Sequence, residues 1–170
     1  TPHNQALGVI SGLEKIAQKE GVPLGELLTR TDYMAHGTTV ATNTMVEYTG
    51  AVTGLITTEG FRDILEFRRG YKESIFDPRL PPPFPIVPRR RRFGVKERID
   101  LEGKVLVPLE EEGVLEALRR FKEAGVESVA VCLLFSFLNP VHERRVAELI
   151  ELELPGVNVS LSHEVLPEIR

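Results

Sequence analysis

The chain has 170 residues, of which 42% are hydrophobic and 27% charged, a composition typical of one globular domain with a hydrophobic core. Its net charge of -4 and pI near 5.7 argue against general electrostatic binding to nucleic acid or anionic membranes, and favour small-molecule chemistry. The longest apolar run, residues 129–135, is too short to span a bilayer. No charged-then-apolar leader pattern occurs, so a cytoplasmic protein without membrane contact is expected.

The first expected element is an amphipathic helix over residues 4–19, because apolar residues recur there at steps of three and four. Gly21 and Pro23 interrupt this pattern, and residues 24–28 predict a short second helical turn. Residues 33–35 then have the pattern of a short strand.

Residues 36–44 are expected to form a turn from that strand into a helix. Gly37 allows the backbone to turn sharply or to approach a ligand closely, and Thr38 or Thr39 can cap the helix. The unpaired amide groups of a helix start favour an anion. The turn therefore predicts a pocket for a phosphate, a carboxylate or a polar ring, although ordinary helix capping explains the same residues.

The side chains of this turn each allow a functional and a structural interpretation. His36 ends the expected strand, where it can orient a substrate or act as an acid or base; a structural histidine that donates to a carbonyl is the alternative. Thr39 and Asn43 are four residues apart and share one helical face, which is either a binding surface or simply hydrated.

The same plan of strand, Thr/Gly turn and helix returns over residues 52–67. Turns at the carboxyl ends of strands in an open α/β sheet face one crevice, so Thr58 and the first turn are predicted to line one pocket. Arg62 would hold an anionic group there, and Asp63 would orient it or hold a metal-bound water. A surface ion pair between Arg62 and Asp63 is the alternative.

Residues 77–95 predict a Pro/Arg-rich loop, because prolines exclude regular helix and four arginines follow them. A linker or a polyproline segment for a partner both fit the prolines. The arginines are expected at a hydrated edge or against acidic groups such as residues 110–112, and no aromatic interleaving supports nucleic-acid binding. Residues 97–107 then predict a β-hairpin.

The last third predicts helix, strand, helix and strand. Residues 110–124 form an amphipathic helix with Val114, Leu118 and Phe121 on its buried face. Residues 126–135 read as a strand that is apolar on both faces, as in parallel sheets. A helix beginning at Asn139-Pro140 and ending near residue 153 leads to a strand at 157–161, which makes a crossover unit.

Two further stretches contain side chains of the types that catalysis uses. Cys132, the single cysteine, cannot form an internal disulfide and is expected to be buried rather than nucleophilic. Ser162, His163 and Glu164 contain the residue types of a hydrolytic site, but neighbours in an extended chain point in opposite directions and are not expected to form a triad with one another. No metal ligand set is predicted. The fold class is α/β, with a mixed or mainly parallel sheet flanked by helices.

Several ordered motifs resemble the N-terminal region of the hydantoinase A / 5-oxoprolinase family, which is similar to a subunit of acetone carboxylases. They cover nearly the whole chain: HGTTVATNTMVE, GAVTGLITTEGFRDILEFRR, VPRRRRFGVKERID, GVESVAVCLLFSFLNPVHERRV and SHEVLPEIR.

The resemblance implies part of an actin-like, ribonuclease H-like ATPase fold, with one phosphate loop before Thr1 and another beyond Arg170, so residues 1–170 are expected to be part of a longer chain. It implies ATP- and Mg²⁺-dependent opening of a cyclic amide such as hydantoin, N-methylhydantoin or 5-oxoproline, in an oligomer with a hydantoinase B type subunit. Thr38, Thr39 and Asn43 would contact phosphate or ring. The alternatives are a subunit of an ATP-dependent ketone carboxylase and a non-catalytic interaction module.

Overall fold

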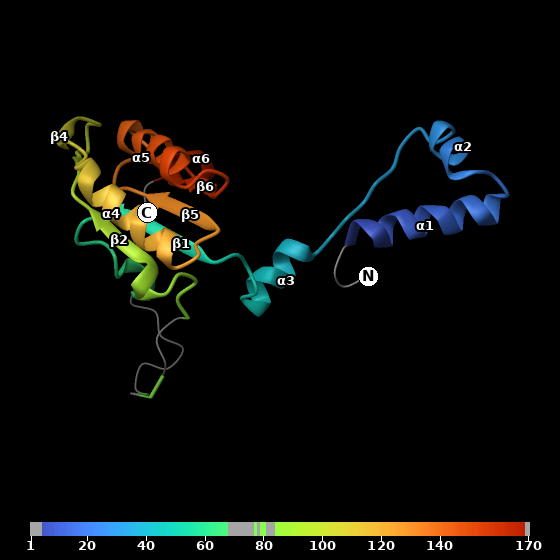
Figure 1. The fold of residues 1–170 in the computed structure, drawn as a ribbon, viewed down its shortest axis with the longest axis horizontal. Coiled ribbons are helices and arrows are strands. Elements are labelled where there is room, and N and C mark those ends of the chain that lie inside the picture. The colour runs from blue at the N-terminus through green and yellow to red at the C-terminus, as the bar shows by residue number, and fades with distance from the viewer. Residues whose placement is uncertain (1–4, 68–76, 78, 81–83, 169–170) are drawn as a thin grey trace. The chain divides into compact units, whose positions relative to one another are not determined.

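The structure is a computed structural model that describes residues 5–67, 77, 79–80 and 84–168. The chain divides into two compact units, one ending at Asn43 and one beginning at Thr44. Figure 1 labels the elements in chain order. No helix in the described ranges combines the length and the apolar character that crossing a membrane requires.

The first unit contains two helices, α1 (Gln5–Glu20) and α2 (Leu24–Thr29), as the sequence predicts. Gly21 ends α1 in the left-handed region at φ 68°, a conformation that glycine adopts without strain. The predicted strand at residues 33–35 is corrected, because this stretch pairs with no strand of the described chain and remains extended without a ladder. Helix α3 (Val40–Glu47) begins where the turn predicts it and straddles the boundary of the units.

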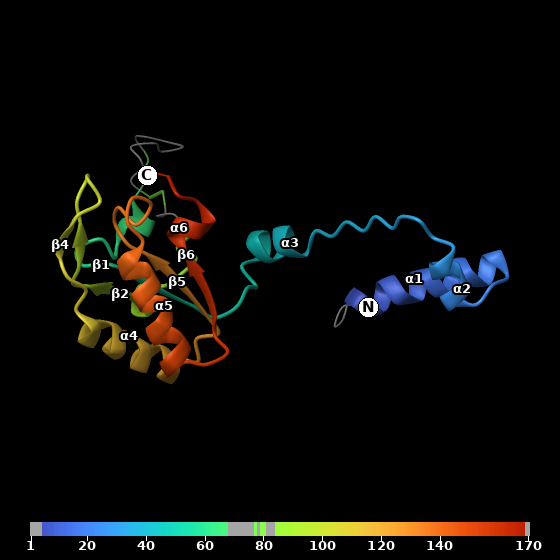
Figure 2. The same cartoon turned by 90° about the horizontal axis from the view of Figure 1, so that it is seen from above.

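The second unit is built on a four-stranded sheet in which all strands are parallel (Figure 2). Its strands are β1 (Thr53–Thr58), β2 (Arg92–Val95), β5 (Ser128–Cys132) and β6 (Asn158–Leu161). They lie side by side in the order β2-β1-β5-β6. The predicted α/β class with a mainly parallel sheet is therefore confirmed.

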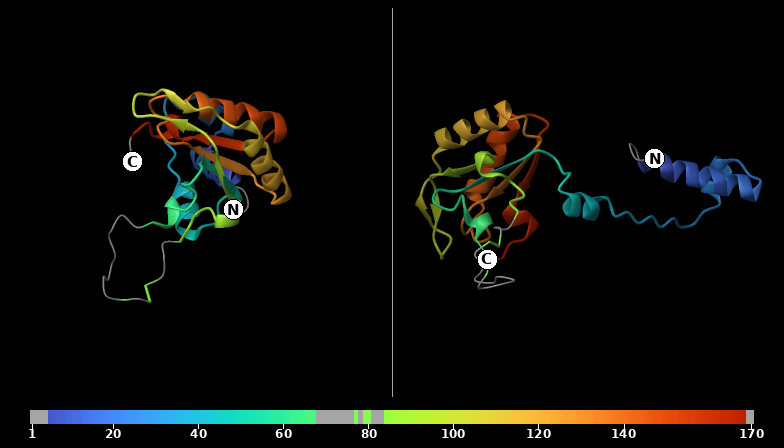
Figure 3. Two further views of the ribbon diagram at one scale, coloured as in Figure 1. Left: turned by 90° about the vertical axis from the view of Figure 1, so that its left-hand side faces the viewer. Right: turned by 90° about the horizontal axis from the view of Figure 1, so that it is seen from below.

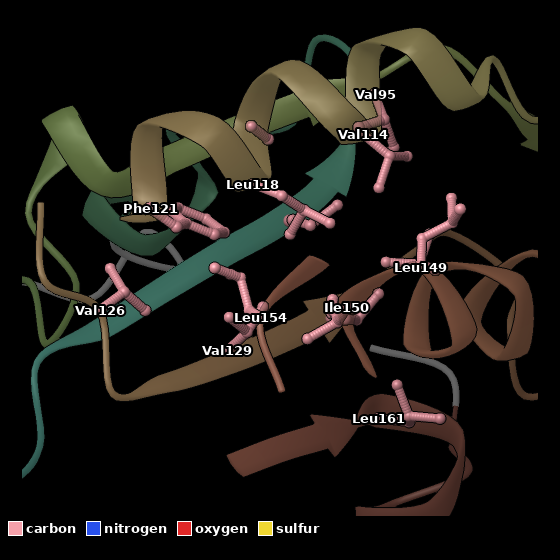
Figure 4. Packing of buried hydrophobic residues seen from close by; sticks show 14 of the residues in the cluster. Val95, Val114, Leu118, Phe121, Val126, Val129, Leu149, Ile150, Leu154 and Leu161 are labelled. Carbon is pink, nitrogen blue, oxygen red and sulfur yellow. The ribbon is translucent and has the colours of Figure 1, made fainter. Parts of the chain in front are cut away.

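Helices α4 (Glu111–Glu123) and α5 (Val141–Glu153) pack against each other and on the sheet, α4 over β1 and β2 and α5 over β5 and β6. Val114, Leu118 and Phe121 are almost completely buried, which confirms the predicted face of α4. Figure 4 shows these side chains on the side of α4 that faces the sheet, and they belong to one buried cluster with Ile150 of α5. Figure 3 shows the layers from two further directions.

A separate two-stranded hairpin, β3 (Arg98–Ile99) with β4 (Val105–Val107), follows the sheet strand β2 and confirms the predicted hairpin. Its turn is joined to the start of α5, because Asn139 Nδ2 donates to the Gly103 carbonyl at 2.8 Å. Asn139 Oδ1 accepts from the Val141 amide at 3.2 Å, so a helix does start at the predicted Asn-Pro pair, with Pro140 rather than Asn139 at the N-cap position.

Three expected elements differ from the structure. The loop predicted over residues 77–95 ends in strand β2, because Arg92 is buried and Val95 belongs to the core; residues 78 and 81–83 lie outside the described residues. Residues 64–67 form only a single 3₁₀ turn, η1 (Ile64–Glu66). The strand expected at 126–135 is shorter, since β5 ends at Cys132, and Cys132 is exposed rather than buried.

Candidate functional site

The carboxyl ends of the parallel strands gather the polar groups of the second unit. From β1 the chain steps outward to β2, and it later places β5 and β6 on the other side of β1, so the strand order reverses between β1 and β5. Ligands of open α/β sheets bind outside the carboxyl ends at such a point. Thr58 ends β1 here, and the turn after β5 begins beside it, because the Leu134 amide donates to Thr58 Oγ1 at 2.9 Å.

Glu143 is the centre of one polar cluster at this edge and is fully buried. Its Oε1 accepts from the Leu133 amide at 2.9 Å and from Ser162 Oγ at 2.6 Å. Its Oε2 accepts from the amide of His163 at 3.1 Å and lies 2.6 Å from His163 Nδ1. Four groups from the ends of β5 and β6 are therefore held by one carboxylate.

The position of Glu143 in α5 supports this arrangement. Glu143 lies in the first turn of α5, where the helix dipole and unpaired amides stabilise negative charge. Each of its four contacts comes from a group that can donate a hydrogen bond, so both oxygens of the buried carboxylate have partners. The cluster is thus fully satisfied and fixes the positions of Ser162 and His163.

A second carboxylate–histidine pair lies next to the first. Glu97 follows β2 and is buried, and its Oε2 lies 2.8 Å from Nδ1 of His142, which is 7% exposed. Thr58 Oγ1 donates to Glu97 Oε1. His142 and Glu143 are consecutive residues in the first turn of α5, so the two carboxylate–histidine pairs are adjacent at the start of one helix.

In a carboxylate–histidine pair, the carboxylate controls the tautomer and the orientation of the histidine ring. A carboxylate accepts a hydrogen bond from the Nδ1–H group, which fixes the tautomer of the ring and leaves Nε2 for a proton or another partner. This is the arrangement by which proteins orient a histidine for proton transfer. Within the part of the chain that the structure describes, no group of three or more His, Cys, Asp or Glu is arranged to hold a metal ion.

A cavity of about 420 Å³ opens beside the Glu143 cluster. Its polar lining consists of Cys132, Ser136, Ser162 and Glu168, and its apolar lining of Leu133, Leu134, Phe135, Phe137, Val165 and Leu166. Phe135 has φ 59°, a conformation that bulky residues rarely adopt and that is typical of functional sites. Its ring lies 5.6 Å from the Arg98 guanidinium, which helps to hold this turn.

The residues predicted at the first Thr/Gly turn lie in the first unit. His36, Gly37, Thr38 and Thr39 are exposed in the extended stretch before α3, and Asn43 lies on α3. The Val40 amide donates to Thr38 Oγ1 at 3.3 Å, which is the capping contact that the sequence allows. The shared pocket with the second turn stays a prediction, because the two turns belong to different units.

The second predicted turn is organised by charge. Thr58 is buried, and its hydroxyl contacts Glu97 and the Leu134 amide. Arg62 Nε lies 3.7 Å from Asp63 Oδ1, as the alternative of an ion pair predicts, but Asp63 pairs more closely with Arg89, whose Nε donates at 2.9 Å. The hydrogen bond from Arg89 and the charges of nearby arginines lower the pKa of Asp63.

Arg92 is the residue of the arginine run that this geometry depends on. Its side chain is fully buried, Nε donates to the Val87 carbonyl at 2.6 Å, and Nη2 lies 2.8 Å from Glu66 Oε1. It also lies 3.8 Å from Asp63. Arg89 and Arg92 therefore meet the acidic residues of the turn after β1. At residues 110–112 the nearby Lys96, which is not part of the run, approaches Glu110 at 4.0 Å.

Sequence reasoning found part of the site at the strand ends. It identified Ser162 and His163 but not their partner, because Glu143 lies 19 and 20 residues earlier in the chain. Glu164 only approaches His163 Nε2 at 3.9 Å. A glutamate in the first turn after an Asn-Pro helix start was the one local signal for Glu143, and no local signal identifies the pair of Glu97 with His142.

Comparison with known proteins assigns the chain to a family. Residues 1–154 match the family described as the hydantoinase/oxoprolinase N-terminal region. The chain is 38% identical over its full length to the caprolactamase subunit alpha of Pseudomonas jessenii, covering 25% of that subunit. It is 37% identical over 99% of its length to the acetophenone carboxylase gamma subunit of Aromatoleum aromaticum, again covering 25% of the relative. The 5-oxoprolinase 1 of Arabidopsis thaliana is 29% identical over 92% of the chain, which covers 13% of that protein.

Solved structures agree with these sequence matches. The crystal structure of the ATP-dependent caprolactamase from Pseudomonas jessenii superposes with a TM-score of 0.87 at 38% identity, covering all of this chain and 25% of that one. The nucleotide-free structure of acetone carboxylase gives a TM-score of 0.78 at 30% identity, with 26% of that chain covered. The chain thus spans about a quarter of the length of these relatives. It belongs to the hydantoinase/oxoprolinase N-terminal region family.

Proposed function

We propose that the chain is the N-terminal region of a larger ATP-dependent enzyme that opens a cyclic amide ring, such as hydantoin, N-methylhydantoin or 5-oxoproline. The observation that supports this most strongly is the similarity to the ATP-dependent caprolactamase, at 38% identity and a TM-score of 0.87 over the entire chain. Caprolactam, hydantoin and 5-oxoproline all contain an amide bond within a ring. The relative named 5-oxoprolinase 1 points to the same bond.

The described residues do not by themselves fit ATP with Mg²⁺. The sequence contains no glycine-rich phosphate loop, and the described part of the chain has no carboxylate-rich group arranged for a metal. We therefore assign no step through the nucleotide to these residues, and expect the rest of a longer chain to bind ATP and Mg²⁺.

The residues of the two turns keep their proposed roles. Thr38, Thr39 and Asn43 would contact phosphate or ring, with His36 as a proton carrier, because these groups are exposed at or near the start of α3, and helix starts favour anions. Arg62 would hold an anionic group, since its side chain is 41% exposed and only loosely paired with Asp63. Asp63 would orient Arg62.

Partners follow from the names of the relatives. The caprolactamase and acetophenone carboxylase relatives are named as alpha and gamma subunits, so we expect this protein to work in an oligomer, with a hydantoinase B type subunit as its partner. We expect this assembly in the cytoplasm, where ATP is available.

The second candidate is a subunit of an ATP-dependent ketone carboxylase. It is favoured by 37% identity to the acetophenone carboxylase gamma subunit and 31% identity to the acetone carboxylase beta subunit of Xanthobacter autotrophicus. Both candidates require an ATP-dependent activation of a carbonyl compound, so the substrate distinguishes them.

The test is phosphate release by the full-length protein with its partner subunit. We expect hydantoin or 5-oxoproline to stimulate ATP hydrolysis at least several-fold, and acetone or acetophenone with bicarbonate to leave the rate at its basal level. Stimulation by a ketone alone would replace the cyclic amide assignment with the carboxylase. Absence of stimulation by every compound would contradict both.

A further inference from the structure

The cavity beside Glu143 has a definite chemical character. Most of its lining is apolar, and Val165 and Leu166 remain 71% and 38% exposed where α6 (Ser162–Val165) ends. Its volume of about 420 Å³ lies in the range of small-molecule sites, roughly 300–1,000 Å³. Such sites combine apolar walls with a few polar groups that select one orientation of the ligand.

Two of the polar groups are serine hydroxyls whose protons already form hydrogen bonds within the protein. Ser162 Oγ donates to Glu143 Oε1 at 2.6 Å, so its single proton points to the carboxylate. Ser136 Oγ lies 2.9 Å from Ser162 Oγ, and the proton between these two oxygens must therefore come from Ser136. The buried carboxylate thus orients both hydroxyls in one direction.

The consequence is that the cavity offers acceptors. Ser136 Oγ donates its one hydrogen bond to Ser162 and keeps its lone pairs as acceptors. The carboxylate of Glu168, at the edge of the cavity, is a second acceptor when it is ionised. A ligand that brings another acceptor to Ser136 would face lone pairs, and a ligand that brings an N–H would complete the chain of hydrogen bonds.

We propose that this cavity binds a small ring whose N–H donates to Ser136 Oγ while its ring carbons pack on the apolar lining, and that this ring is the cyclic amide substrate. The identification with the substrate rests on the proposed function, whereas the preference for an N–H donor rests on the hydroxyl chain. Ser136 is then a residue that determines specificity, and Glu143 positions it through Ser162.

The test compares two rings, 5-oxoproline and caprolactam, with their N-methyl derivatives on the full-length protein and its partner subunit. In the wild type, each ring stimulates ATP hydrolysis at a concentration at least tenfold lower than its N-methyl derivative. Ser136→Ala raises the half-saturating concentration of the ring about tenfold, changes the maximal rate little and removes the preference over the N-methyl form. Ser136→Thr, which keeps a hydroxyl, restores the preference.

Ser160→Ala is the matched control, because Ser160 is an exposed residue of β6 that does not line the cavity. It should leave the half-saturating concentration unchanged. Alkylation of Cys132, measured on its own peptide by mass spectrometry, gives a readout without activity, because Cys132 is exposed and lines the cavity. The bound ring should slow this alkylation in the wild type but not in Ser136→Ala.

The outcomes separate the two proposals. If the rings stimulate the wild type and Ser136→Ala keeps the same half-saturating concentration and preference, the cavity assignment is overturned and the proposed function remains. If no ring stimulates the wild type, the proposed function fails, and the alkylation of Cys132 then tests the cavity assignment. Slower alkylation with the ring in the wild type but not in Ser136→Ala supports N–H recognition. The same slowing in both proteins, or no slowing in either, overturns it. Should Ser136→Ala fold poorly, equal stimulation of the wild type by a ring and its N-methyl derivative overturns the assignment.

Discussion

At the scale of single residues, Glu143 joins three parts of the chain. It holds the turn after β5 through Leu133, and the start of α6 through Ser162 and His163, from its own place in the first turn of α5. All four groups that contact its carboxylate can donate a hydrogen bond to it, so the side chain must accept at both oxygens. The residue therefore supports the cavity as well as the histidine.

Glu143→Gln tests this arrangement with little change of shape. A glutamine must place its NH₂ group against one of the two amides, Leu133 or His163, which leaves that amide without its acceptor. We expect the free energy of unfolding to fall by about 1–3 kcal/mol in urea titrations of the chain. Glu148→Gln on the same helix is the control, because the Glu148 side chain is 62% exposed, and it should change stability by less than about 0.5 kcal/mol. Equal effects of the two substitutions would contradict a central role for Glu143.

At the scale of elements, the contact between β1 and α4 is unusually close. An added Cβ at Gly54 would lie 2.6 Å from the ring of Phe121, which is fully buried and packs edge-on against Phe93 at a centroid distance of 5.3 Å. The glycine thus allows the helix to approach the central strand. Such a contact has no room for a side chain, because interiors are packed at crystal-like density.

Gly54→Ala should therefore destabilise the protein, by about 1–3 kcal/mol, because the Phe121 ring or the helix must move. Gly113→Ala is the matched substitution within α4, where the nearest atom to an added Cβ is 3.9 Å away. It should stabilise by about 0.5–1 kcal/mol, because alanine loses less backbone entropy in a helix. Thermal unfolding followed by circular dichroism compares the pair, and a neutral Gly54→Ala would show that β1 and α4 can separate without cost.

At the scale of the whole molecule, two ion pairs link segments that are distant in sequence. Arg89 donates to Asp63 from before β2, and Arg145 of α5 donates to Glu111 of α4 at 2.7 Å. These hydrogen bonds lower the pKa of both carboxyls from their ordinary values of 3.8 and 4.5. The two carboxylates therefore favour the folded state only while they are ionised.

The sign of the pH dependence follows from these lowered pKa values. The stabilisation is complete above the unfolded values near 3.8 and 4.5, and is lost as the pH falls through the lower folded values. We expect the unfolding midpoint to decrease as the pH falls below about 4.5, and the combined change Asp63→Asn with Glu111→Gln to make this decrease shallower. Glu123→Gln, at the exposed end of α4, should leave the slope unchanged. A slope that is identical in the double variant and the wild type would assign the acid sensitivity to other groups.

The sequence alone determined the elements whose signals are local. Apolar periodicity located α1, α4 and the strands β1 and β6, Asn139-Pro140 located the start of α5, and the ordered motifs identified the family. Only the tertiary structure decided what depends on contacts between distant residues. The sequence did not predict strand β2, because a buried Arg92 is tolerated only beside Glu66 and Asp63, which are distant in sequence. The sequence also did not predict that Cys132 is exposed, because its neighbours are apolar. Hydrophobic patterns act over a few residues, whereas a buried charge depends on partners that folding brings from elsewhere, and for this reason the pairs around Glu97 and Glu143 could not be predicted from the sequence.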